Sequence, residues 1–237
     1  MTGKRTGMFK KCVKYAIIGL VLIFMYVPIL ILDSPNIGAI HSFSFHNYVT
    51  LFTTPELIDM IIGSIALAIG SAVLATILGT TGAIGAFYSK KNVNGTMSVL
   101  NQIPVVNADV VTGFSLCILL VVVFGVSKNT YIPLVIGHTV LSAPFVYLAV
   151  VPKLKQMDPS LYEAALDLGA TPGYTLIHII IPQIASGIIS GFVMAVTLSL
   201  DDYFVATYTK PATFDTISTY VVNATKGSQT NIRTALW

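Results

Sequence analysis

Long apolar stretches with almost no charge are the feature that most limits the fold of this chain. The first covers residues 15–32, which as a helix is about 27 Å long and just spans the hydrocarbon core of a bilayer. Four further stretches of this kind follow, at residues 60–88, 97–126, 131–152 and about 184–208. Five membrane-spanning helices are therefore predicted.

The composition agrees with a chain surrounded mainly by lipid. Hydrophobic residues make up 54% of the sequence and charged residues only 10%, whereas a soluble domain carries roughly 25% charged residues. These values exclude an ordinary soluble enzyme, a disordered chain and a disulfide scaffold. The net charge of +3 is too small to indicate nucleic acid binding. We predict an all-α, polytopic transmembrane helix bundle.

The first apolar stretch has two possible interpretations. A signal peptide is one, because basic residues precede the stretch, and a retained transmembrane helix is the other. The apolar run is long for a signal peptide, and no small-residue cleavage site follows it. We therefore favour the retained helix.

Lysine and arginine residues decide the orientation, because they resist translocation across the membrane. With the N-terminus in the cytoplasm, nine of the 13 lie inside, a better split than any other arrangement of five spans gives. The nine are Lys4, Arg5, Lys10, Lys11, Lys14, Lys90, Lys91, Lys153 and Lys155. We expect a cytoplasmic tail at 1–14, a transmembrane domain at 15–209 with a cytoplasmic loop at 153–182, and an extracytoplasmic stretch at 210–237.

The cytoplasmic loop contains a predicted short helix with signals at both ends. Asp158 can accept hydrogen bonds from the first free N–H groups, and Pro159 suits the first helical position. Gly169 can adopt the left-handed conformation that ends a helix. Thr171 then caps a second helix, which we expect Pro182 to interrupt. One face of the short helix is apolar, formed by Leu161, Ala164, Ala165 and Leu168.

Short capped helices are common in loops, but this one is part of a longer pattern. The spacing E-A-A-x3-G-x9-I-x-L-P is matched, apart from isoleucine at the leucine position, by Glu163, Ala164, Ala165, Gly169, Ile179, Ile181 and Pro182. The pattern resembles the EAA loop of ABC importer permeases, which implies a type I importer permease fold. In that family the loop forms a coupling helix that docks into a cytoplasmic ATPase. The resemblance implies this coupling role for Glu163, Ala164, Ala165, Gly169 and Pro182.

The chain lacks the Gly-x4-Gly-Lys-Ser/Thr loop that holds nucleotide phosphates. We therefore expect that it is not an enzyme, that it carries no cofactor, and that a partner ATPase binds ATP and magnesium. No cluster of histidine and cysteine residues indicates a metal site. His138 and His178 are interpreted as packing or loop residues.

Three carboxylates lie at membrane depth, where ionisable groups cost roughly 2.5–3.5 kcal/mol and are usually functional. Asp109 follows Pro104 in the third stretch, where we expect the helix to break. Asp201 and Asp202 lie in the outer half of the fifth. No lysine or arginine lies at that depth, so we expect a cation from a partner or a substrate to face these acids. The alternative is that Asp201 or Asp202 caps a helix or pairs with an adjoining subunit.

Two aromatic residues next to the acid pair complete the predicted substrate path, which consists of Asp109, Asp201, Asp202, Tyr203 and Phe204. An aromatic ring can face an ammonium group. Aromatic residues that sit at the membrane interface without contacting a substrate are the commoner case, and they are the alternative here.

The sequence around these acids is similar to a narrower family, the spermidine/putrescine permeases of the PotC type. The similarity is carried by residues 43–52, 103–111 and 197–204. It implies a second permease subunit (PotB-type), two ATPase subunits (PotA-type) and an extracytoplasmic polyamine-binding protein (PotD-type) at a bacterial plasma (inner) membrane. Such permeases usually have six spans, so a sixth is expected in addition to the five found. The alternatives are an ABC permease for another organic cation or a metal, and a proton-coupled secondary carrier.

Overall fold

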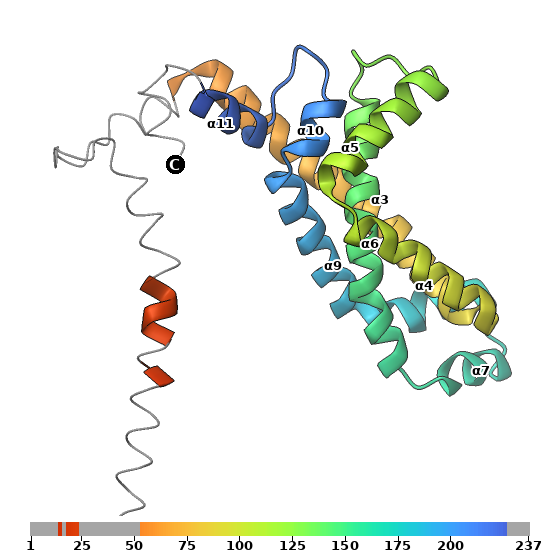
Figure 1. Cartoon of the computed structure of the whole chain (residues 1–237). Coiled ribbons are helices and arrows are strands. Elements are labelled where there is room, and N and C mark those ends of the chain that lie inside the picture. The colour runs from red at the N-terminus through yellow and green to blue at the C-terminus, as the bar shows by residue number, and fades with distance from the viewer. Residues whose placement is uncertain (1–13, 16–17, 24–52, 227–237) are drawn as a thin grey trace, which may run out of the picture. The chain divides into compact units, whose positions relative to one another are not determined.

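The computed structural model describes residues 14–15, 18–23 and 53–226, and this part of the chain contains helices and no strands. Residues 56–223 form one compact unit, which contains the features discussed below (Figure 1). The first predicted span lies mostly outside the described residues. So does the end of the predicted extracytoplasmic stretch, from residue 227 onward.

Three helices of the described part are long and apolar enough to cross a membrane. They are α3 (Pro55–Tyr88), α6 (Ile132–Gln156) and a continuous helix over Pro172–Asp201, which comprises α8 (Pro172–Thr175), η2 (Leu176–Ile180) and α9 (Ile181–Asp201). The first two confirm the predicted second and fourth spans. The fifth span was predicted to continue to about residue 208, which is wrong. It ends at Asp201, and a separate short helix, α10 (Phe204–Thr209), follows.

Pro182 does not interrupt the fifth span, contrary to our expectation. The π-helical turn η2 precedes the proline, and the Ile181 N–H donates to the carbonyl of Leu176, five residues back. A π-helical turn widens the backbone locally and so accommodates a residue that has no N–H to donate. The helix that leaves the loop and the fifth span are therefore one continuous element.

The predicted third span is broken into two helices. α4 (Lys91–Val106) and α5 (Asp109–Ile118), which continues into η1 (Leu119–Val123), meet at a bend of 105°. The break was expected at Pro104, but Pro104 lies inside α4, and the Asn107 N–H still donates to the Ile103 carbonyl (3.1 Å). The backbone becomes extended at Asn107 and Ala108 instead.

The core lies where α6 and α9 pack against each other and against α3. Its buried members include Ala72, Ala75, Ala83, Val146, Val150, Leu154, Ile184 and Ala195. Small residues allow close approach: a Cβ on Gly191 of α9 would lie 3.1 Å from the Cα of Val146 in α6. In lipid, such van der Waals packing takes over much of the role that the hydrophobic effect has in water.

The short helix α10 packs tightly against α5 and α6. A Cβ on Gly113 of α5 would lie 2.9 Å from the Cα of Val205, and a Cβ on Gly137 of α6 would lie 2.8 Å from the Cγ1 of Val205. The rings of Phe114 and Tyr208 meet edge to face, with centroids 5.6 Å apart. These contacts hold the start of α10 close to α5, so the break in the third span and the end of the fifth lie near each other.

Gly113→Ala is expected to loosen this contact and to destabilise the bundle. The new Cβ would meet backbone and not a flexible side chain, so a helix must shift, at a cost of about 1–3 kcal/mol. We expect the apparent melting temperature of the purified protein in detergent to fall by about 2–10 °C. Gly70→Ala is the matched control, because no described atom beyond the neighbouring residues and nearby backbone of its own helix lies within 4 Å of its Cβ position. Equal shifts for the two variants would contradict the packing described here.

Candidate functional site

A cavity of about 490 Å³ lies where the break between α4 and α5 meets the break between α9 and α10. Its lining residues are Val105, Asn107, Ala108, Asp109, Leu141, Phe145, Leu198, Asp201, Asp202, Tyr203 and Phe204. All five residues of the predicted substrate path are among them. Broken helices are tolerated at membrane depth where the freed backbone lines a cavity, and transporters commonly bind substrates at such places.

Two of the three acids have carboxylates that are available to a ligand. Asp109 begins α5, and Asp201 is the last residue of α9; both are exposed. Within the described part of the chain, neither carboxylate forms a hydrogen bond or an ion pair; Asp201 accepts only at its backbone carbonyl, from the Ser218 hydroxyl (3.2 Å). The two side chains therefore contribute unneutralised negative charge to the cavity.

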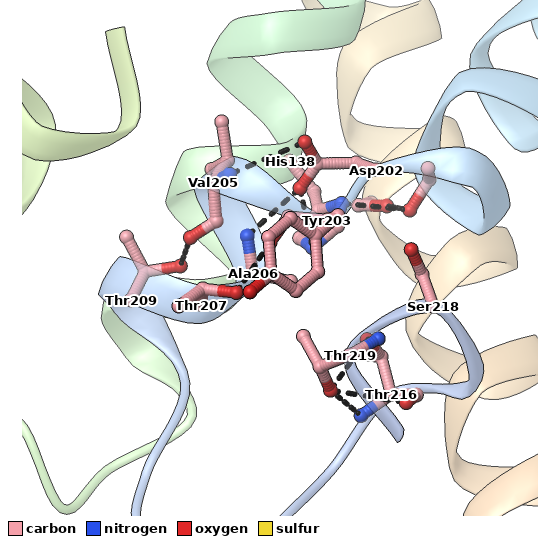
Figure 2. A network of polar contacts seen from close by, with 12 residues as sticks. His138, Asp202, Tyr203, Val205, Ala206, Thr207, Thr209, Thr216, Ser218 and Thr219 are labelled. Atoms are coloured by element: carbon pink, nitrogen blue, oxygen red, sulfur yellow. Dashed lines mark hydrogen bonds and ion pairs between the residues drawn. The ribbon is translucent and has the colours of Figure 1, made fainter. Parts of the chain in front are cut away.

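Asp202 is different, because its carboxylate is used inside the protein. Its side chain is only 3% exposed, and its Oδ1 and Oδ2 accept hydrogen bonds from the backbone N–H groups of Val205 (3.2 Å) and Ala206 (2.8 Å). Figure 2 shows the carboxylate between these two N–H groups and the ring of His138. The carboxylate thus caps the start of α10 directly after the end of α9.

The expectation that the acids lack an internal partner is wrong for Asp202. The Nε2 atom of the fully buried His138 lies 3.8 Å from Asp202 Oδ2. The prediction failed because it considered only lysine and arginine as counter-ions and treated His138 as a packing residue. The available signal was a histidine within an otherwise apolar span, since ionisable residues at membrane depth usually have a partner there.

The aromatic part of the predicted path also lies at the cavity. The rings of Tyr203 and Phe204 meet edge to face, with centroids 5.2 Å apart, and Phe204 is exposed. Tyr203 lies between Asp202 and α10, and Phe204 is the first residue of α10, so the cap formed by Asp202 positions both. Apolar walls and a few polar groups are the usual composition of small-molecule sites.

The predicted coupling loop lies at the other end of the bundle. The 21 residues of α9 separate it from Asp201 by about 30 Å. The loop helix α7 (Ser160–Asp167) is capped as expected: Asp158 Oδ1 accepts hydrogen bonds from the Ser160 N–H (2.9 Å) and hydroxyl (2.7 Å). These bonds hold the pKa of the Asp158 carboxyl below its ordinary value.

The C-terminal end of α7 also matches the prediction. Gly169 has a φ of +87°, and two hydrogen bonds close the helix, from the Gly169 N–H to the Leu166 carbonyl (2.9 Å) and from the Ala170 N–H to the Ala165 carbonyl (3.0 Å). This is the Schellman arrangement, which requires a left-handed residue at the position of Gly169. The Thr171 hydroxyl oxygen then accepts from the Tyr174 N–H (3.4 Å) and caps α8.

The apolar face predicted for α7 is divided in the structure. Ala165 is buried against its own chain, whereas Glu163, Ala164 and Leu168 are exposed. Leu168 is 90% exposed and lies on the free face of α7. The ring of Tyr162 contacts Tyr88 at the end of α3, with centroids 5.0 Å apart, and so fixes α7 to the bundle.

Comparison with known proteins identifies first the fold and then the family. A chain of a bacterial alginate ABC transporter, in a crystal structure with its alginate pentasaccharide-bound periplasmic protein, superposes with a TM-score of 0.74 at 20% sequence identity. The match covers 98% of this chain and 88% of that chain. This likeness shows the fold of an ABC importer permease. The chain belongs to the family of binding-protein-dependent transport system inner membrane components, whose model matches residues 80–237, and it is therefore a multi-pass membrane permease of the ABC importer type.

Two similar proteins define the relationship more narrowly. The spermidine/putrescine transport system permease protein PotC of Haemophilus influenzae is 30% identical over 213 residues, which cover 86% of this chain and 80% of that protein. The putrescine transport system permease protein PotI of Escherichia coli is 30% identical over 197 residues, or 78% of this chain and 70% of that protein. The resemblance to the PotC type and the predicted fold class are confirmed.

Proposed function

We propose that this chain forms part of the pore through which a polyamine is imported. The observation that carries the proposal is the convergence of the Asp109 and Asp201 carboxylates on one cavity from two separate helix breaks. The names of the similar permeases, which specify spermidine and putrescine, support the same class of substrate.

The chemistry of the cavity suits a polyamine better than a compact cation. Two carboxylates can each accept an ammonium group, while Leu141, Phe145 and Leu198 offer apolar surface to the methylene segments between the ammonium groups. The aromatic faces next to Asp202 add favourable sites for a positive charge. An acidic cavity also disfavours an anionic substrate such as the alginate named for the structural neighbour.

The energy for import is supplied by partners in this proposal. A second permease (PotB-type) completes the pore, two ATPase subunits (PotA-type) bind ATP and magnesium, and an extracytoplasmic binding protein (PotD-type) delivers the polyamine. The N-terminus and α7 face the cytoplasm, where Glu163, Ala164 and Leu168 contact an ATPase subunit. The continuous helix from α8 to α9 carries the movement of α7 toward the cavity, and the pore alternates between inward and outward access.

The proposal is tested by uptake of radiolabelled spermidine and putrescine into proteoliposomes that contain the complete transporter. Uptake is expected only with ATP on the cytoplasmic side and with binding protein outside, and it should continue when an ionophore removes the proton gradient. Uptake that depends on the proton gradient would indicate a secondary carrier. If the transporter takes up neither polyamine but accumulates another cation, the proposed substrate is wrong.

A further inference from the structure

Three side chains form a buried polar chain through the core, each from a different helix. The hydroxyl oxygen of Ser71 in α3 lies 3.2 Å from that of Ser199 in α9, and the latter lies 3.0 Å from Nδ1 of His138 in α6. All three residues are buried, with His138 and Ser71 fully inaccessible. Polar side chains in this setting are costly unless each one is satisfied, so their arrangement calls for a role.

The nearby Asp202 carboxylate decides which nitrogen of the neutral His138 ring carries the proton. If Ser71 donates to Ser199 and Ser199 donates to Nδ1, the remaining proton of a neutral ring is on Nε2. This N–H then faces the Asp202 carboxylate. In the opposite order, Nδ1 donates to Ser199, Ser199 donates to Ser71, and Ser71 donates to the Ala68 carbonyl (3.2 Å). That order turns an Nε2 lone pair toward the carboxylate at 3.8 Å, and the two would repel. We therefore assign the first order, in which the Nε2–H faces Asp202 at a distance too long for a hydrogen bond.

The Asp202 carboxylate is contacted by the first N–H groups of α10 and by the ring of His138. Its two oxygens already accept from the Val205 and Ala206 N–H groups, and His138 approaches the oxygen that binds Ala206 (Figure 2). Nε2 has no hydrogen-bond partner in the described part of the chain. The ring is therefore directed at the carboxylate that positions the cavity wall.

We infer that His138 is a positioning residue for substrate binding: it holds the Asp202 carboxylate, and through it the turn that carries Tyr203 and Phe204. The inference rests on the proposed function, because it concerns the shape of the same cavity. Ser71 and Ser199 orient the ring, so the packing of α3, α6 and α9 is linked to the cavity wall by one continuous line of polar contacts. Asp202 has this structural task, which leaves Asp109 and Asp201 as the carboxylates that contact the cation.

A double-mutant cycle tests the link in the complete transporter. His138→Leu and Asp202→Asn are each expected to raise the KM of polyamine uptake by about tenfold, and the double variant should be no worse than either single one. His138→Gln, whose amide retains a donor, should stay within about threefold of wild type. Thr139→Val is the matched control, because Thr139 is buried on the same helix and its hydroxyl donates only to Val135.

A second measurement does not depend on the substrate. Hydrogen exchange of the α10 amides, among them those of Val205 and Ala206, should be about tenfold faster in His138→Leu than in wild type and unchanged in Thr139→Val. If the wild-type transporter takes up no polyamine, the proposed function fails, but the exchange rates still test the inference. Unchanged exchange in His138→Leu, or additive effects in the cycle, would overturn it.

Discussion

Gly169→Val is expected to uncouple ATP hydrolysis from import. A φ of +87° is unfavourable for a β-branched residue, so the last turn of α7 must open or rotate, at a cost of about 1–3 kcal/mol. Glu163, Ala164 and Leu168 would then no longer be presented together. In reconstituted transporter, we expect the stimulation of ATPase activity by substrate-loaded binding protein to fall by about tenfold or more, because 1.4 kcal/mol corresponds to a factor of ten.

Two control variants show whether the effect comes from the left-handed backbone at position 169 or from any substitution in the loop. Gly169→Asn should retain most of the stimulation, because asparagine tolerates the left-handed conformation. Gly173→Ala, four residues along the same loop, places a Cβ in open space and should behave as wild type. If Gly169→Val and Gly169→Asn show the same stimulation of ATPase activity, coupling does not require the left-handed conformation at position 169.

Asp109→Asn and Asp201→Asn are each expected to reduce polyamine uptake strongly at low substrate concentration. Hydrogen bonds to a charged group contribute about 1.5–3 kcal/mol, so the loss of one carboxylate should lower Vmax/KM by about 10- to 100-fold. Both residues are exposed at the cavity, and their carboxylates form no hydrogen bond or ion pair in the described part of the chain, so the transporter should still assemble. The measurement is initial uptake per assembled complex over a range of polyamine concentrations.

Asp59→Asn makes the same chemical change on an exposed part of α3 that does not line the cavity, and it should leave uptake unaltered. A reduction equal to that of Asp201→Asn would mean that overall negative charge, and not the cavity, attracts the substrate. Normal uptake by both cavity variants would remove the cation path from the mechanism.

Local signals predicted the helices and the loop well, because those signals act within a few residues. Hydropathy located α3 and α6, and the caps at Asp158 and Gly169 located α7. The burial of Ala165 was not predictable in this way, since it depends on how α7 packs against the rest of the chain. Sequence spacing shows which residues share a face but not which neighbour covers that face.

The positions of the helix breaks were harder to predict because they depend on contacts between distant segments. Pro104 was the obvious local candidate, but the bend occurs at Asn107 and Ala108, near the place where α10 packs against Gly113. The five residues of the predicted path nevertheless line one cavity, and the sequence signal that grouped them was charge at membrane depth, which is rare. His138 was missed because its relation to Asp202 appears only when α6 and α9 lie side by side.

The π-helical turn η2 determines how α9 is rotated about its axis relative to the loop. A turn with one extra residue rotates everything after it by about 100° relative to an uninterrupted α-helix. The side of α9 that meets α6, including Gly191 and Ala195, is therefore aligned with the loop through these five residues, Leu176–Ile180. A length change of a single residue here would turn Asp201 away from the cavity while leaving every individual helix intact.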